Sequence, residues 1–315
     1  MIWLFLRGRM ERHKECAWKT LEECTDMWTH LFAGMVGEKD KGITIYSNGN
    51  KKIKYRDNFI EQWIHSFKDY KKASPDIIIA RGGFKEYIPL LRKYSNAKKV
   101  YYGANHGCIP KDGIKYDLIM CDSEEQVRKC KKHGLNGQLF IKPAAPCFYP
   151  RDVEKKYDVG FSAIWPKDKR KNVAWVHKTA PKGLKILQMG HACKAPLNFS
   201  VKYIDHDRMA RAISKCKVVI APYTKEDSCP RIIPEALACG VPVVALGSCQ
   251  FWYGKYPVNS INKKYFWKTV KKRIGSSHYW FSEDKKGLCM DVVEGIYNKN
   301  ISVPVAAKHL RELIV

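Results

Sequence analysis

The chain has 315 residues and is 45% hydrophobic, which is enough for two ordinary domains with separate cores. Its 57 Lys and Arg residues against 31 Asp and Glu residues leave a formal charge of +26. This excess predicts attraction to a polyanion, either nucleic acid or an anionic membrane surface, and is more than a small anionic ligand alone requires.

The 12 cysteines include no Cys-x-x-Cys pair. Several fall within expected helices and strands, among them Cys121, Cys216 and Cys239. We interpret them as reduced, buried thiols of a cytoplasmic protein, not as a disulfide framework or a zinc site. The apolar stretch from Met1 to Leu6 is too short for a signal peptide or a membrane span, so we interpret it as a first strand.

The first half of the chain is expected to alternate strands and helices. Arg7-Gly8-Arg9 is interpreted as a turn after the first strand, and Ser123 with Gln126 has the spacing of a capping box. The expected strands are 2–6, 76–80, 99–103, 116–120 and 139–141, and the expected helical segments end near 32, 94 and 133.

A proline-rich stretch at 142–150 is interpreted as a linker, and a second series of strands and helices follows it. Its expected strands are 158–163, 184–189 and 217–221, with a helix at 206–216. Such alternation predicts parallel sheets, and two series around one linker predict two Rossmann-like domains.

The segment 227–245 is the most informative part of the chain. Asp227 and Glu235 are separated by seven residues beside an expected helix start, with Pro234 as the first helical residue. A helix start has unpaired N–H groups that suit a diphosphate, and neighbouring carboxylates can accept hydrogen bonds from sugar hydroxyls. Gly240 suits the end of this helix, and the apolar run after it is typical of a buried strand.

This segment resembles the donor-binding motif of retaining GT-B glycosyltransferases, family 4 (group 1), in which two glutamates are separated by seven residues. Asp227 stands where the first glutamate is usual, so its reach is shorter by one methylene. The resemblance covers 116–245 well and the first 75 residues only in outline. It implies an α/β GT-B fold, with two Rossmann-like domains facing each other across a cleft.

The same resemblance assigns the parts of the chain. Residues 1–146 would form the acceptor-binding domain and 147–300 the nucleotide-sugar-binding domain. The last segment, 301–315, is expected to pack back on the first domain.

The resemblance also implies which residues hold the donor, a nucleotide-diphosphate sugar such as a UDP-sugar. Glu235 would bind the ribose hydroxyls and Asp227 the transferred sugar. Cations of the run 167–171, in the first place Lys169 and Lys171, would offset the charge of the leaving diphosphate, so that no metal ion is required. The expected donor-binding residues are Lys169, Arg170, Lys171, Gly190, Ser228, Cys229, Arg231, Ile232 and Glu235.

His106 completes the expected catalytic residues, with Asp227 and Glu235. It follows a predicted strand end, where ligands of open α/β sheets bind. In similar enzymes a histidine at this place faces the reacting sugar.

The leading hypothesis for the acceptor is DNA that carries a hydroxymethylated pyrimidine, as in viral DNA-modifying members of the class. The charge of +26 and the cysteine usage motivate it, and such an enzyme would act in the host cytoplasm. Basic residues could neutralise phosphates, and the aromatic residues among them could stack on bases or lie in the core. The residues expected at the acceptor or DNA are Arg7, Arg9, Arg81, Lys263, Lys264, Lys271, Lys272 and Arg273.

Two alternatives remain open. One is an envelope glycosyltransferase with a lipid-linked or lipopolysaccharide acceptor, whose basic face would bind anionic lipid. The other is a nucleic-acid-binding protein that has kept the GT-B fold without catalysis, and Asp227 in place of glutamate gives it some weight.

Overall fold

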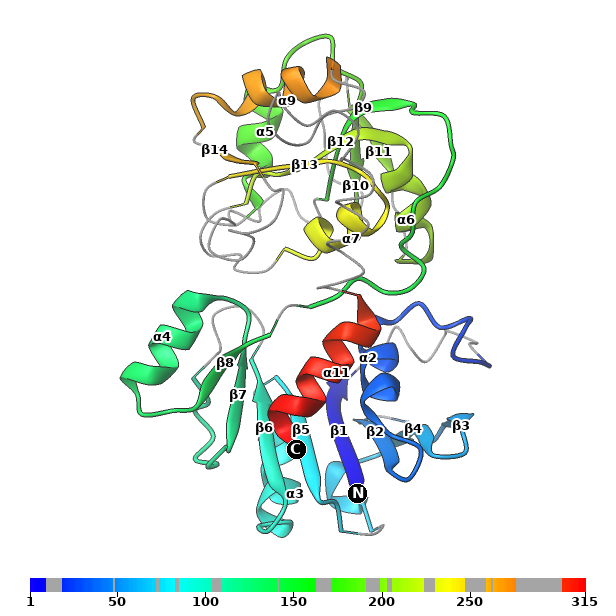
Figure 1. Ribbon diagram of the computed structural model, residues 1–315, viewed down its shortest axis with the longest axis vertical. Helices are drawn as coiled ribbons and strands as arrows, with labels where there is room; N and C mark the ends of the chain where they lie inside the picture. Colours follow the sequence, from blue (N-terminus) through cyan, green and yellow to red (C-terminus); the bar gives the residue numbers. More distant parts are fainter. Residues whose placement is uncertain are drawn as a thin grey trace. The chain divides into compact units, whose positions relative to one another are not determined.

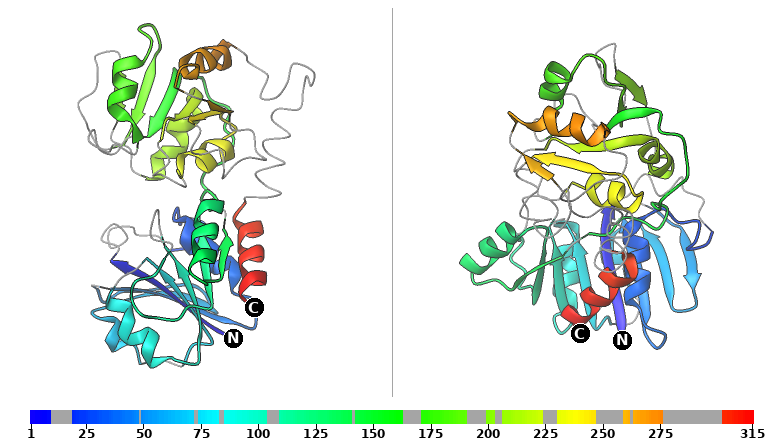
Figure 2. Two further views of the ribbon diagram at one scale, coloured as in Figure 1. Left: turned by 90° about the vertical axis from the view of Figure 1, so that its left-hand side faces the viewer. Right: turned by 45° about the horizontal axis from the view of Figure 1, so that its top comes forward.

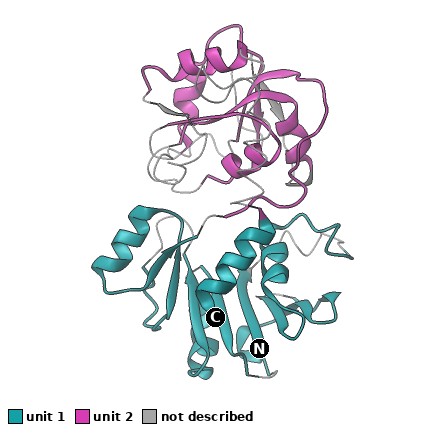
Figure 3. Cartoon of the chain, viewed as in Figure 1, with its two compact units in different colours: residues 1–141, 303–315 teal, residues 142–302 magenta. Residues whose placement is uncertain are grey.

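A computed structural model divides the chain into two compact units (Figure 3). Unit 1 comprises Met1–Ile141 and Val303–Val315, and unit 2 comprises Lys142–Ser302. The structure describes residues 1–9, 19–47, 49–71, 74–82, 85–103, 109–140, 142–162, 171–190, 199–202, 206–223, 230–246, 259–261, 263–275 and 302–315.

Unit 1 is built on an eight-stranded sheet of order β3-β4-β2-β1-β5-β6-β7-β8 (Figure 1). All neighbouring strands are parallel except β3 and β4, which form an antiparallel pair. The strands are β1 (Ile2–Arg9), β2 (Lys41–Ser47), β3 (Lys52–Arg56), β4 (Phe59–Ile64), β5 (Ile77–Arg81), β6 (Lys98–Tyr102), β7 (Leu118–Cys121) and β8 (Gly137–Leu139). The helices are α2 (Met27–Met35), η1 (Phe67–Asp69), η2 (Lys85–Tyr87), α3 (Ile88–Lys93), α4 (Glu124–Lys132) and α11 (Val303–Ile314).

Helices cover both faces of this sheet because the central strands are apolar on both sides. Phe5 of β1 stacks on Phe32 of α2, with ring centroids 4.1 Å apart. Leu4 and Leu6 point to the opposite face and share a cluster with Leu90 and Leu91 on α3. The continuous apolar runs predicted as strands at 2–6 and 76–80 are therefore confirmed as central strands.

The predicted turn at Arg7-Gly8-Arg9 is wrong, because β1 continues to Arg9. Gly8 has a φ of 65°, and the register against β2 shifts between Leu6 and Arg9. The glycine therefore makes a bulge inside the strand and does not end it. The helix predicted to end near 32 begins only at Met27, where the Asp26 carboxylate accepts a hydrogen bond from the Thr29 amide.

The predicted capping box of α4 is half formed. The Ser123 hydroxyl accepts a bond from the Gln126 amide at 3.3 Å, as expected. The Gln126 side-chain oxygen accepts from the backbone amide of Asp122 at 2.5 Å, one residue before the position that a capping box uses.

The last helix, α11, belongs to unit 1 and packs against α2 (Figures 1 and 2). The Arg311 guanidinium donates to the Met35 carbonyl and to the Asp40 carboxylate, each at 2.6 Å. The close approach requires Gly34, where an added Cβ would lie 3.0 Å from the Ala307 Cβ.

Unit 2 contains a six-stranded, all-parallel sheet of order β11-β10-β9-β12-β13-β14. Val159 and Phe161 of β9 pack with helix residues Val176, Phe266 and Val270 on one face. The strands are β9 (Tyr157–Ser162), β10 (Ile186–Met189), β11 (Phe199–Lys202), β12 (Cys216–Ala221), β13 (Val243–Leu246) and β14 (Asn259–Ile261). The helices are α5 (Val173–Thr179), α6 (His206–Ser214), α7 (Ile232–Ala238) and α9 (Phe266–Gly275).

The predicted strands and helices of unit 2 are all present, with ends shifted by a few residues. Residues 142–150, predicted as a linker, contain neither helix nor strand. Among the helices in the described ranges, none is both long and apolar enough to span a bilayer.

Candidate active site

The strand order of unit 2 locates a ligand-binding position. From β9 the chain moves outward to β10 and β11, and it then returns to β12 and continues to β13 and β14 on the other side. The direction of winding therefore reverses between β9 and β12. In open parallel sheets, ligands bind at such a switch point, beyond the carboxyl ends of the strands.

Three hydrogen-bonded or stacked contacts fix the chain at this switch point. The Tyr223 hydroxyl, just after β12, donates to the Ser162 carbonyl at the end of β9, at 3.0 Å. The Asn172 amide donates to the Pro222 carbonyl at 2.7 Å, and its own backbone is left-handed, with a φ of 49°. The Lys171 ammonium lies 4.8 Å from the centre of the Tyr223 ring. Of the predicted cationic run, Lys171 is therefore held at the edge where a donor would bind.

Glu235 lies in the first turn of α7, the helix that follows β12. It is only 4% exposed, and its carboxylate accepts an ion-paired hydrogen bond from Arg231 at 3.0 Å. Arg231 is thus positioned by Glu235, four residues away, and the two predicted donor residues occur as a pair. Ile232, also predicted at the donor, has its side chain in the core, so only its backbone remains for a ligand.

The predicted start of this helix at Pro234 is wrong, because α7 begins at Ile232. Pro234 is tolerated as the third residue of α7 because it lies in the first turn. Backbone N–H groups in the first turn have no partner within the helix, so the missing N–H of proline costs no hydrogen bond.

Gly190 follows the end of β10, next to β9, with a φ of 144°. This backbone region favours glycine, and a residue without a side chain lets a ligand approach the main chain. The glycine therefore lies at the same edge as Lys171 and Glu235, as expected from the parallel strands.

Several predicted site residues lie outside the described residues, and their predictions stay predictions. They are His106, Lys169, Arg170, Asp227, Ser228 and Cys229. Among the side chains that the structure does describe, no group of three His, Cys, Asp or Glu is arranged to hold a metal ion.

Arg7, predicted at the acceptor, is placed differently by the structure. Its side chain is buried and pairs with the Asp26 carboxylate at 2.5 Å and 3.3 Å through its two terminal nitrogens. Burial alone would lower the pKa of Arg7, but the adjacent Asp26 charge outweighs it and raises that pKa. The guanidinium therefore pairs with a carboxylate in the interior of unit 1, and the prediction that Arg7 contacts the acceptor is wrong.

The same network continues to Glu61, which is fully buried. Its carboxylate accepts from the hydroxyls of Thr29 at 2.6 Å, Tyr46 at 2.8 Å and Tyr55 at 3.2 Å. Arg7 also donates to the Tyr46 hydroxyl at 2.9 Å. These contacts tie β1, β2, β3, β4 and α2 together, and no sequence motif predicts them.

Arg81 ends β5, the strand next to β1, and stacks over the Trp28 ring at 4.8 Å. It is half-buried, so its position at the carboxyl edge is compatible with the predicted acceptor role. Arg9 ends β1 at the same edge. Arg9 and Arg81 therefore flank the switch point of the unit 1 sheet, between β1 and β5.

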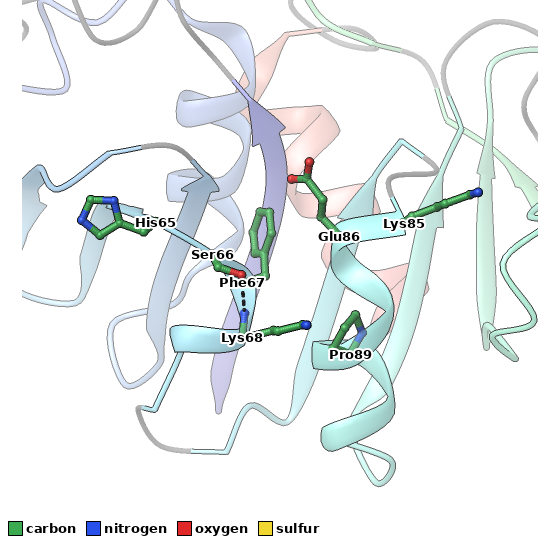
Figure 4. Close-up of a pocket in the computed structure, with 7 residues that line it drawn as sticks. All are labelled: His65, Ser66, Phe67, Lys68, Lys85, Glu86 and Pro89. Carbon is green, nitrogen blue, oxygen red and sulfur yellow. Dashed lines mark hydrogen bonds between the residues drawn. The ribbon is translucent and has the colours of Figure 1, made fainter.

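An open groove of about 430 Å³ adjoins this edge of unit 1 (Figure 4). Sequence reasoning missed it, because its residues come from two segments, 65–68 and 85–89, that are brought together only by the fold. Figure 4 shows the side chains of Lys68 and Lys85 on either side of Glu86. The lining residues are His65, Ser66, Phe67, Lys68, Lys85, Glu86 and Pro89.

The predicted DNA-contacting residues Lys263, Lys264, Lys271, Lys272 and Arg273 belong to α9 and the turn before it. Within unit 2, α9 and α7 pack against strands β12 and β13 from opposite faces of the sheet (Figures 1 and 2). Phe266 is in the core, as the plainer interpretation of these aromatic residues expected, whereas Tyr265 is 48% exposed.

No protein-family model and no curated protein matches the sequence. Among solved structures, the chain is similar to sucrose-phosphate synthase from Thermosynechococcus elongatus, with a TM-score of 0.70, 12% identity, and coverage of 99% of this chain and 98% of that one. It is also similar to the T4 phage β-glucosyltransferase, with a TM-score of 0.61, 12% identity, and coverage of 100% and 99%. A third similar structure is HepE from Anabaena in complex with UDP-glucose, with a TM-score of 0.63, 10% identity, and coverage of 99% of both chains. The chain therefore has the GT-B glycosyltransferase fold, as the resemblance implied.

Proposed function

We propose that this protein transfers a sugar from a nucleotide-diphosphate sugar, a UDP-sugar in the first place, to a hydroxyl group of an acceptor. The observation that carries the proposal is the switch point of unit 2. There the buried Glu235 carboxylate and the Lys171 ammonium lie at the edge of a parallel sheet where ligands bind. Similar structures were solved with UDP-glucose bound, which supports the donor class.

In this proposal, Glu235 accepts hydrogen bonds from the ribose hydroxyls, and Arg231 keeps its carboxylate oriented. Lys171, with Lys169 and Arg170, offsets the charge that develops on the leaving diphosphate. Asp227 holds the transferred sugar, and His106 faces its reacting side, as the resemblance implies. This scheme requires no metal ion, so we expect transfer to continue in the presence of EDTA.

The chemical step breaks the bond between the anomeric carbon and the diphosphate oxygen and forms a bond to the acceptor oxygen. The leaving diphosphate takes the proton of the acceptor hydroxyl. The resemblance implies that the anomeric configuration is retained. NMR of the product sugar, compared with that of the donor, tests this part separately.

We propose a hydroxymethylated pyrimidine base of DNA as the acceptor. The charge of +26 supports it, and one similar structure is described as a DNA-modifying enzyme. A base inside the duplex is out of reach of a buried donor site, so the enzyme would have to flip it out, at a cost of a few kcal/mol.

The experiment is transfer from radiolabelled nucleotide sugars, with hydroxymethylated duplex DNA and bacterial lipid extract as parallel acceptors. Label in the DNA is the expected result. Label in the lipid alone would replace this acceptor with a lipid-linked one. No transfer to either acceptor, together with no binding of any nucleotide sugar, would overturn the enzymatic proposal and favour a binding protein.

His106→Ala gives a sharper test of the chemistry. We expect transfer to fall by about 100-fold or more, with an unchanged unfolding midpoint, because a positioned catalytic group contributes on this order. His133→Ala, an exposed position at the end of α4, is the matched control. Equal turnover of both variants would show that His106 takes no part in transfer.

A further inference from the structure

A second basic feature of unit 2 lies on the face of its sheet that α5 and α9 cover. The residues 175–182 and 263–273 form one surface, here called the α5–α9 surface. Trp267 joins the two segments, because its indole N–H donates to the Thr179 hydroxyl at 2.9 Å and its ring stacks on Trp175 at 6.4 Å. Its exposed cations are Lys178, Lys182, Lys263, Lys264, Lys268, Lys271 and Lys272, and neither segment contains an Asp or Glu.

Two of these cations lie over aromatic rings: Lys263 is 5.3 Å from the Trp175 ring centre and Lys264 is 5.5 Å from that of Tyr265. Lys268 and Lys272 are four residues apart on α9, so they repel each other along its face. Lys263 and Lys264 precede the helix start, where the partial positive charge of the helix disfavours cations. A stable surface helix would place carboxylates at some of these positions. The arrangement therefore lowers the stability of isolated α9 and indicates an anionic partner.

The length of the lysine row points to an extended polyanion. From Lys268 to Lys272 α9 rises about 6 Å, and Lys263 and Lys264 extend the row beyond the start of the helix. Duplex DNA carries one phosphate charge per about 1.7 Å of its axis, so the helical part of the row alone spans on the order of three to four phosphates. A nucleotide sugar has only its diphosphate and would leave most of the row without a partner.

A membrane surface fits this face less well. Interfacial helices insert an exposed apolar side, but the apolar side of α9, with Phe266 and Val270, is in the core of unit 2. The indole N–H of Trp267 already has its partner in Thr179. Tyr265 is the one large apolar residue of the described surface that is more than a third exposed.

We propose that the α5–α9 surface binds the phosphodiester backbone of nucleic acid, without base specificity, as a tethering site distinct from the donor site. Lysines act here as point charges on phosphates, which position a duplex and carry no sequence information. Because the sheet of unit 2 lies between α9 and α7, DNA held along α9 is on the other face of the sheet from Glu235. This inference does not depend on the proposed chemistry.

The test is fluorescence anisotropy with an unmodified 30-bp duplex and no nucleotide sugar, between 50 and 200 mM salt. The variant is K268Q/K271Q/K272Q on α9. Glutamine has nearly the helix propensity of lysine, so folding is expected to be kept. We expect an affinity loss of about tenfold or more at 100 mM salt. The slope of log K against log salt should fall by about three, since each phosphate contact contributes roughly 0.9.

The matched control is K129Q/K131Q/K132Q on α4 of unit 1, which removes the same charge from another basic helix. We expect it to change the affinity less than threefold. An equal loss in both triple variants would overturn the proposal, because net charge alone would then explain binding. Unchanged duplex binding of the α9 variant, together with loss of its binding to phosphatidylserine vesicles, would also overturn the proposal. The α5–α9 surface would then be a membrane-binding site. Unfolding midpoints and UDP-glucose binding of both variants check that the fold is intact.

Discussion

Glu235 combines burial, a charge and a place at the switch point, so the donor proposal can be tested on one side chain. Glu235→Gln keeps the size but removes the charge that strengthens hydrogen bonds to ribose hydroxyls. We expect UDP binding to weaken by roughly 10- to 100-fold, in line with the loss of a charged hydrogen bond. Isothermal titration calorimetry with UDP measures it.

The control for this prediction is Glu312→Gln on α11, an exposed glutamate that also has a basic partner four residues away. It should bind UDP as the parent does. Equal affinity of the Glu235 and Glu312 variants would show that Glu235 has a structural role only, as the partner of Arg231.

Asp40 gives a pH-dependent prediction. It accepts from Arg311 at 2.6 Å and from the Met1 ammonium at 3.0 Å. Burial opposes ionisation, but these hydrogen bonds outweigh it and lower the pKa of Asp40 from 3.8 to about 2. A lowered pKa in the folded state means that the stabilisation is complete above pH 4 to 5 and is lost as the pH falls toward 2.

Asp40→Asn should therefore lower the free energy of unfolding by about 1–3 kcal/mol at pH 7, because the partly exposed Arg311 and Met1 cations lose their charged partner. The difference from the parent should shrink as the pH falls to 2. Urea unfolding at a series of pH values measures it. Asp57→Asn, which removes an exposed carboxylate paired with Lys54, should leave the midpoint unchanged. A difference that persists at pH 2 would contradict this assignment.

The buried cysteines should be unreactive in the native protein. Burial raises the pKa of Cys24, Cys216 and Cys239 from 9.0 to about 12. At pH 8 the reactive thiolate is then populated about a thousandfold less than for a thiol at its ordinary pKa. Mass spectrometry after iodoacetamide treatment should find these three labelled only in urea. Rapid labelling of the native protein would show that they are exposed.

For single residues, the sequence predicted only part of what the structure shows. Glu235 could be predicted as a donor residue because it belongs to a motif with a fixed spacing before a helix, and the structure places it buried in the first turn of α7. Arg7 was misassigned because a basic residue after a strand resembles a surface cation, and its partner Asp26 is distant in sequence and has no motif. The groove beside Lys68 and Lys85 had no sequence signal, because it depends on how two turns meet.

Among the elements, α11 makes a testable contribution to unit 1. Leu310 is fully buried on this helix. Leu310→Ala should lower the free energy of unfolding by about 2–5 kcal/mol, the usual cost of truncating a buried leucine. Glu312→Ala, on the exposed side of the same helix, is the control and should have little effect. Thermal unfolding of the two variants, monitored by circular dichroism, measures the difference. Equal midpoints would show that α11 does not contribute to the hydrophobic core.

The predictability of the elements followed their burial. The central strands β1, β5 and β7 were predicted because each has an uninterrupted apolar run, at 2–6, 77–80 and 118–121, for two covered faces. The strands β2, β3 and β4 were missed because they mix polar and apolar residues. In β3, Lys52 and Lys54 alternate with Ile53, over too short a run to distinguish a strand from a loop. Where β1 ends was also missed, because a glycine inside a bulge looks like a glycine in a turn.

For the whole molecule, the prediction concerns the independence of the two units. Removal of residues 303–315 takes a helix from unit 1 and nothing from the sheet of unit 2. We expect hydrogen exchange to quicken at the amides of α2 and β1, and to stay as it was in β9 and β12. Faster exchange in both sheets would mean that the units unfold together.

The discontinuity of unit 1 has a consequence for protein synthesis. The ribosome makes residues 1–141 first, then all of unit 2, and only then the α11 helix that covers α2. Unit 2 is therefore complete while unit 1 still lacks a layer, and the apolar side of α2 with Gly34 stays uncovered in the nascent chain. A chain that stops before α11 would expose this surface to chaperones and proteases, whereas a chain that includes α11 can cover it.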